Sequence, residues 1–161
     1  MKEIILSSES NKNYCLTWIK EKALDGKHTV ILKKTDKSPT AAQRRLQWLW
    51  NSEVAMSGLG SDDDKMDVHI RAKYQFCRPI LLRDNEIYGA IDTYFHDTVK
   101  NAENKAELIK EFARDYISTE QLTRKQRTEY LTEFQRFWLN KGVNLTNPEM
   151  QGVDLKKELR L

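Results

Sequence analysis

The sequence predicts an α+β protein with a small N-terminal β-sheet and a mostly helical remainder. Two short apolar and β-branched runs near the N-terminus, Ile4–Leu6 and "HTVILKK" (28–34), are typical of strands. Apolar residues recur at helical spacing through most of the rest. A chain of 161 residues with six glycines, three prolines and a mean hydropathy of −0.72 also fits a wet, largely helical domain.

The first sixty residues are predicted to form a strand–helix–strand–helix lobe. A helix from about Asn11 to Leu24 separates the two expected strands, with Tyr14 and Trp18 on one face. A second helix follows the second strand, with Ser38 as its N-cap and Pro39 at its first position.

Residues 61–148 are predicted to form a helical lobe that shares the core of the first. Ser61 can cap a helix that Pro79 ends or kinks, and residues 85–100 and 104–118 supply two more helices, the first of them ambiguous with a strand. Thr123 and Gln126 predict a capping box, and Gly142 suits the end of that helix. Its apolar stripe is Tyr130, Leu131, Phe134 and Trp138. Residues 149–161 form a tail or a short terminal helix.

Two tryptophans two positions apart cannot both face one core. At helical angles Trp50 falls on the core side with Leu46, and Trp48 falls opposite, beside Arg44 and Arg45. An exposed indole beside guanidinium groups can stack on an unpaired base while the arginines hold phosphate. Packing of Trp48 on a second helix layer or on a dimer partner is an equally open alternative.

Further basic residues extend this candidate DNA-binding surface. Net charge is only +3, so the position of the cations matters more than their sum. The "TRKQR" run places three cations at a helix start, where free N–H groups favour an anion. The predicted DNA-binding residues are Lys33, Lys34, Lys37, Arg44, Arg45, Trp48, Arg71, Lys73, Arg124, Lys125 and Arg127.

Catalysis is not indicated, and no cofactor or metal is expected. His28, His69 and His96 lack partner ligands at metal-site spacing, and no phosphate-cradling or nucleophile motif occurs. Asp63-Asp64-Lys65, and Asp92 with Glu103-Asn104-Lys105, are similar to the acidic pattern of Mg²⁺-dependent nucleases. Nuclease chemistry needs these groups to converge on Mg²⁺ from a sheet edge, whereas both stretches are predicted as helix or loop. A nuclease is therefore kept only as an alternative.

The order of these segments resembles the NinB family, the Orf-type recombination proteins of lambdoid phages and prophages. Three segments carry the likeness: "ILSSESNKNYCLTWIKEKALDGKHTVILKK", "SPTAAQRRLQWLW" and "ISTEQLTRKQRTEYLTEFQRFWLNKGVNLTNPE". The chain departs from the family where Ala42-Gln43 replaces its usual Gln-Asn pair and where the tryptophan register is shifted.

This resemblance implies a homodimer that binds single-stranded DNA. It also implies assistance in loading a phage recombinase onto DNA covered by the host single-strand binding protein. The family's basic positions match Arg44, Arg45 and the cluster Arg124–Arg127. The absence of an export-signal pattern and the unpaired spacing of Cys15 and Cys77 lead us to expect the bacterial cytoplasm, with no membrane partner. A module that binds a host replication or recombination protein is the main rival reading.

Overall fold

The computed structural model describes residues 9–22, 27, 30, 40–60 and 64–160. By compactness the chain divides into residues 1–36 and residues 37–161, which are described separately. The first unit contains helix α1 (Glu9–Lys20). Of its described aromatic residues, Tyr14 is exposed and Trp18 is half-buried.

Helices are the only regular elements among the described residues of the second unit. Its elements are α2 (Ala41–Ser57), α3 (Lys65–Ala72), the π-helix η1 (Lys73–Cys77), α4 (Arg78–Asp84), α5 (Glu86–Val99), α6 (Lys105–Tyr116), the 3₁₀ turn η2 (Thr119–Gln121), α7 (Arg124–Asn140), the 3₁₀ turn η3 (Pro148–Gln151) and α8 (Leu155–Leu159).

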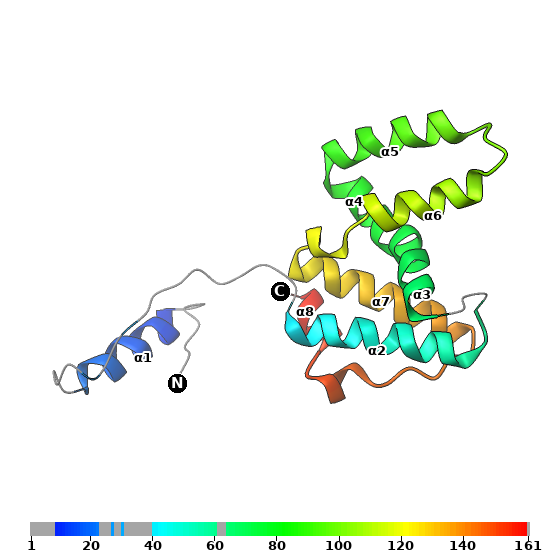
Figure 1. Ribbon diagram of the computed structural model, residues 1–161. Coiled ribbons are helices and arrows are strands. Elements are labelled where there is room, and N and C mark those ends of the chain that lie inside the picture. Colours follow the sequence, from blue (N-terminus) through cyan, green and yellow to red (C-terminus); the bar gives the residue numbers. More distant parts are fainter. Residues whose placement is uncertain (1–8, 23–26, 28–29, 31–39, 61–63, 161) are drawn as a thin grey trace. The chain divides into compact units, whose positions relative to one another are not determined.

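Helices α2 and α7 lie side by side and run in the same direction (Figure 1). The fully buried Trp50 of α2 stacks on Phe134 of α7, with ring centroids 6.0 Å apart. The Trp50 indole N–H donates to the carbonyl of Thr146 at 2.9 Å, so its polar edge is also satisfied. The predicted stripe Tyr130, Leu131, Phe134 and Trp138 is buried as expected.

The capping box of α7 is confirmed, because Thr123 and Gln126 each accept a backbone N–H of the other. A second such box, unpredicted, starts α2: Thr40 is the N-cap and pairs with Gln43. The helix therefore begins two residues after the predicted start. Asp64, rather than Ser61, caps α3, where its carboxylate accepts two backbone N–H groups.

The predicted small N-terminal β-sheet is wrong. The described residues are mostly helical and include no strand. Within the expected second strand only Val30 belongs to the described residues, and it is 62% exposed and outside any strand. A β-branched run favours a strand only where a partner strand and a half-buried surface receive it, and Val30 is exposed to solvent instead. The expected first strand, Ile4–Leu6, lies outside the described residues.

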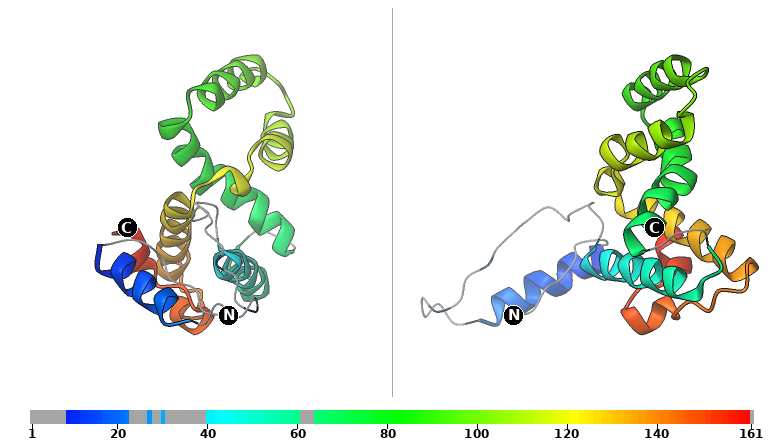
Figure 2. Two further views of the ribbon diagram at one scale, coloured as in Figure 1. Left: turned by 90° about the vertical axis from the view of Figure 1, so that its left-hand side faces the viewer. Right: turned by 45° about the vertical axis from the view of Figure 1, so that its right-hand side comes forward.

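The helix across Pro79 bends without ending. Proline removes one backbone N–H from the helical ladder, and the five residues before Arg78 take up the change as a π-helix. The same bend carries α4, α5 and α6 to the end of the unit away from α2 (Figures 1 and 2). Within the ambiguous stretch 85–100, Glu86–Val99 is the helix α5.

Candidate nucleic-acid interface

The parallel arrangement of α2 and α7 brings their N-terminal turns together. Gln43 of α2 donates to the Arg124 carbonyl at 3.2 Å and to the Thr128 hydroxyl at 2.8 Å. Arg44 and Arg45 therefore lie at the same end of the helix pair as Arg124 and Lys125. Two positive helix-dipole ends meet four basic side chains here, an arrangement that attracts anions.

A buried carboxylate from the last helix joins this end. Glu158 of α8 accepts hydrogen bonds from the Gln43 amide at 2.7 Å and from the Thr128 hydroxyl at 3.0 Å. The Arg124 guanidinium pairs with the same carboxylate at 2.9 Å. Part of the basic charge is thus neutralised internally, and Arg124 is tied to the protein more firmly than the sequence predicts.

Arg45 and Lys125 remain as exposed cations at this end. Among the described residues neither has an ion pair or hydrogen-bond partner for its side chain. Both carry positive charge that is available to a ligand, so they are the predicted cations that best fit contacts with phosphate.

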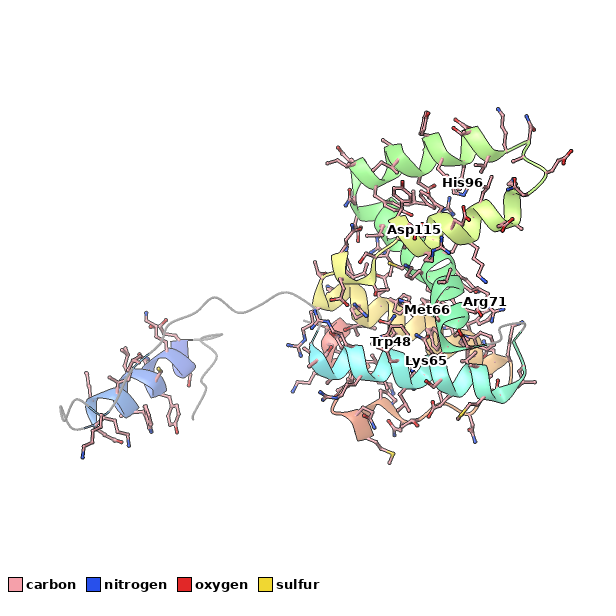
Figure 3. All side chains as sticks on the ribbon, viewed as in Figure 1. Trp48, Lys65, Met66, Arg71, His96 and Asp115 are labelled. Atoms are coloured by element: carbon pink, nitrogen blue, oxygen red, sulfur yellow. The ribbon has the colours of Figure 1, made fainter. Side chains whose placement is uncertain are left out.

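The two tryptophans of α2 divide as helical geometry predicts. Trp50 is 0% exposed, whereas Trp48 is 37% exposed. Trp48 lies on the side of α2 toward α3 (Figure 3), and its ring centroid is 4.6 Å from that of His69. One face of the indole is thereby supported, while more than a third of the side chain stays open to solvent.

Trp48 borders a pocket with a cavity volume of about 340 Å³. The pocket is lined by residues of α2, of the α3–η1 segment, of the end of α6 with the residues that follow it, and by Arg127 of α7. Its charged lining consists of Arg44, Lys73, Arg114, Asp115, Glu120 and Arg127. With four basic and two acidic groups, the lining carries a net positive charge.

Arg127 forms the back wall of the pocket and is 1% exposed. Its guanidinium donates to the Gln47 side-chain oxygen, to the Thr119 carbonyl at 2.7 Å and to the Glu120 carboxylate at 2.8 Å. Burial lowers the pKa of Arg127, and the Glu120 carboxylate opposes that shift. Arg127 was predicted to contact phosphate at the surface, but its side chain is buried. Its guanidinium could meet a ligand only at the position that the Glu120 carboxylate occupies.

The same amide of Gln47 orients His69. Because the Gln47 oxygen accepts from Arg127, its nitrogen donates to His69 Nδ1 at 2.9 Å. Burial and the nearby charges of Lys73 and Arg127 lower the pKa of His69 to about 4. His69 is thus neutral at physiological pH, and it offers Trp48 a ring surface rather than a charge.

Lys73 lies in the π-helix and is buried. Its ammonium group donates to the Arg114 carbonyl at 2.7 Å, and burial lowers its pKa. Lys73 therefore contributes charge to the pocket wall from a fixed position. Arg114 itself is exposed and pairs with its neighbour Asp115 at 3.0 Å.

The remaining predicted residues lie elsewhere. Arg71 places its guanidinium over the Trp138 ring at 5.1 Å, away from the lining of the pocket. Lys33, Lys34 and Lys37 lie outside the described residues. The structure thus brings Arg44, Trp48, Lys73 and Arg127 to one pocket, and Arg45, Arg124 and Lys125 to the adjacent helix ends.

Sequence reasoning missed the polar side of α2. Gln43, Gln47 and Asn51 recur every four residues beside Leu46 and Trp50, and all three are buried. Of the three, Gln43 and Gln47 make the side-chain hydrogen bonds described above. Polar residues at helical spacing next to a core stripe are the signal that could have revealed this buried polar side. The role of Glu120 in the site was also missed.

Two of the acidic residues considered for a nuclease, Asp64 and Asp92, have other partners in the structure. Asp92 is buried, and its two oxygens accept from Arg78 at 2.7 and 2.8 Å. Asp64 caps α3, and Asp63 lies outside the described residues. Among the described residues no group of three His, Cys, Asp or Glu side chains is arranged to hold a metal ion.

Comparisons with protein families, with curated proteins and with solved structures find no match to this chain. Of the helices in the described part of the chain, none combines the length and the apolar character that crossing a membrane requires.

Proposed function

We propose that this protein binds DNA without catalysis, favours single strands, and acts as a recombination accessory factor. The observation that carries the proposal is Trp48, an indole supported by His69 and open on the edge of a net basic pocket. Such a ring stacks on a base only if that base is free of its own partner. Single strands supply such bases, and duplexes do not.

The basic helix ends support the same proposal. Arg45 and Lys125 would hold strand phosphates at the paired helix ends, and the dipoles of α2 and α7 would add to their field. The recombination role rests on the resemblance to the NinB family in segment order. In that setting the partners would be a phage recombinase and the host's single-strand binding protein, and the protein would act as a homodimer in the bacterial cytoplasm.

A second candidate function is a module that binds another protein. Helix α5 favours it, because Ile87, Ile91 and Tyr94 recur along one side of that helix and are all exposed. Ile87 and Tyr94 are each 76% exposed, which is unusual for large apolar groups that share a face. This face lies on the part of the unit away from α2 (Figure 2), so the two candidate functions use different surfaces.

One experiment separates the candidates. Gel shift on single-stranded and double-stranded DNA, with and without Mg²⁺, should show salt-sensitive binding that favours the single strand and leaves the DNA intact. Absence of binding at low salt would refute the DNA-binding proposal and favour the protein-interaction module. Cleavage that requires Mg²⁺ would instead support the nuclease alternative.

A further inference from the structure

Glu120 holds a position at the pocket that suits an anion. One carboxylate oxygen accepts from Arg44 Nε at 2.9 Å and pairs with its Nη2 at 2.8 Å, and the other accepts from Arg127 Nη2 at 2.8 Å. These two guanidinium groups come from different helices and converge on one point. The hydrogen bond from Arg44, followed by the contact with Arg127, lowers the pKa of Glu120, which is therefore ionised at neutral pH.

The two arginines differ in how exposed they are. Arg127 is fixed from behind by Gln47 and by the Thr119 carbonyl, so its Nη2 points at the Glu120 position whether or not the carboxylate is there. Arg44 and Glu120 have side chains that are 42% and 56% exposed. An ion pair this exposed contributes little free energy, so a competing anion can replace the carboxylate at low cost.

A phosphate can take this position with the same division of its oxygens as the carboxylate. The planar guanidinium group of arginine can donate two parallel hydrogen bonds to a phosphate. A phosphodiester can also offer one oxygen to each of the two arginines. Trp48 is one helical turn after Arg44 and borders the same pocket. A cavity of about 340 Å³ is near the lower limit for small-molecule sites and suits one nucleotide.

We propose that the Glu120 carboxylate occupies the phosphate subsite for a single nucleotide of bound single-stranded DNA, and that a strand phosphate displaces it on binding. The nucleotide's base then stacks on Trp48, and its phosphate lies between Arg44 and Arg127. This inference rests on the proposed DNA-binding function and names the residues that form one unit of the binding site. Glu120 sets the affinity by competing with the strand.

Replacement of Glu120 by glutamine tests the proposal in the full-length protein. Glu120→Gln removes the competing charge, so affinity for a labelled oligothymidylate should rise by about threefold or more at low salt. The salt dependence should also steepen, by up to about 0.7 in the logarithmic slope, because one more phosphate is neutralised without releasing a carboxylate. Fluorescence anisotropy over a salt series measures both quantities.

Glu133→Gln is the matched control. The side chain of Glu133 on α7 is 45% exposed and pairs with Arg136, outside the pocket lining, so this variant changes the net charge equally and leaves the pocket intact. Thymidine monophosphate and inorganic phosphate, added as competitors, separate a nucleotide subsite from a simple anion site. Stronger competition by the nucleotide is expected, and equal competition would overturn the assignment of the base to Trp48.

The outcomes distinguish this inference from the proposed function. If the wild type binds and Glu120→Gln behaves like Glu133→Gln, the subsite is refuted and DNA binding stands. If neither the wild type nor the variant binds, both proposals fail. Should Glu120→Gln not fold, Arg44→Gln replaces it as the test, since loss of that guanidinium must weaken binding, and unchanged affinity refutes the subsite.

Discussion

The Trp48 indole lies against the His69 imidazole, with ring centroids 4.6 Å apart and an interplanar angle of 41°. His69 is held by the Gln47 amide, which is held in turn by Arg127. The orientation of the exposed tryptophan therefore depends on a chain of hydrogen bonds that starts at the buried Arg127 of α7. This chain links the stability of the core to the geometry of the candidate DNA-binding surface.

The stability of the protein is expected to fall on acidification because of His69. In the folded protein burial lowers the pKa of His69 from 6.5 to about 4, so the unfolded chain takes up a proton before the folded one does. The contribution of His69 to the free energy of unfolding is therefore fully present above pH 6.5. The protein loses this contribution as the pH falls from 6.5 toward 4. The loss from this residue amounts to at most about 3 kcal/mol.

Urea unfolding across this pH range, in the wild type and in His69→Asn, measures that share. Asparagine keeps an acceptor for the Gln47 amide but does not titrate, so the variant should lose less stability than the wild type on acidification. Parallel pH curves for the two proteins would show that His69 titrates normally in the folded state.

Truncation of Trp48 is expected to weaken binding to single-stranded DNA. Because the ring is 37% exposed, Trp48→Ala should leave the fold intact while raising the free energy of binding by roughly 1–3 kcal/mol. Fluorescence anisotropy measures the affinity, and circular dichroism checks the fold. Met56→Ala is the matched control, since Met56 is an exposed apolar residue of the same helix outside the pocket lining. Equal affinities for the two variants would eliminate the stacking role.

Substitution of Arg127 by alanine is expected to destabilise the protein far more than the same substitution at the nearby Lys125. Arg127→Ala leaves the Gln47 oxygen and the Thr119 carbonyl without their donor in a buried region, at a cost of about 3 kcal/mol. Lys125 lies two residues earlier on α7 and is exposed. Its replacement by alanine should change the free energy of unfolding by less than about 0.5 kcal/mol. Urea denaturation of both variants gives the comparison, and a similar small effect for both would contradict the structural role of Arg127.

The helical elements were largely predictable, because each carries a local signal. The capping box at Thr123 and the stripe from Tyr130 to Trp138 are patterns within one helix, and both are confirmed. The separation of Trp48 from Trp50 followed from helical angle alone. The N-terminal sheet was predicted from the same kind of local signal and failed, because strand formation depends on a partner that a local pattern does not specify.

The site was predictable only in part, for a physical reason. Sequence periodicity places Arg44 and Arg127 on their helices but does not say that both converge on Glu120. Nor does it distinguish a buried cation such as Lys73 from an exposed one such as Lys125. Burial of a charged residue depends on long-range packing, here of α2 against α7, and that packing separates structural cations from those that can meet a ligand.

The exposed cations at the paired helix ends are expected to contribute to the salt dependence of DNA binding. For single strands each phosphate contact contributes roughly −0.7 to the slope of log affinity against log salt. Reversal of the charge in Lys125→Glu, or in Arg45→Glu, should therefore weaken binding and flatten the slope by about one contact each. Anisotropy titrations over a salt series measure this slope. Lys100→Glu provides the control, because Lys100 is an exposed cation at the end of α5, on the part of the unit away from α2 (Figure 2). If all three variants shift the slope equally, only net charge matters, and the helix ends hold no phosphate.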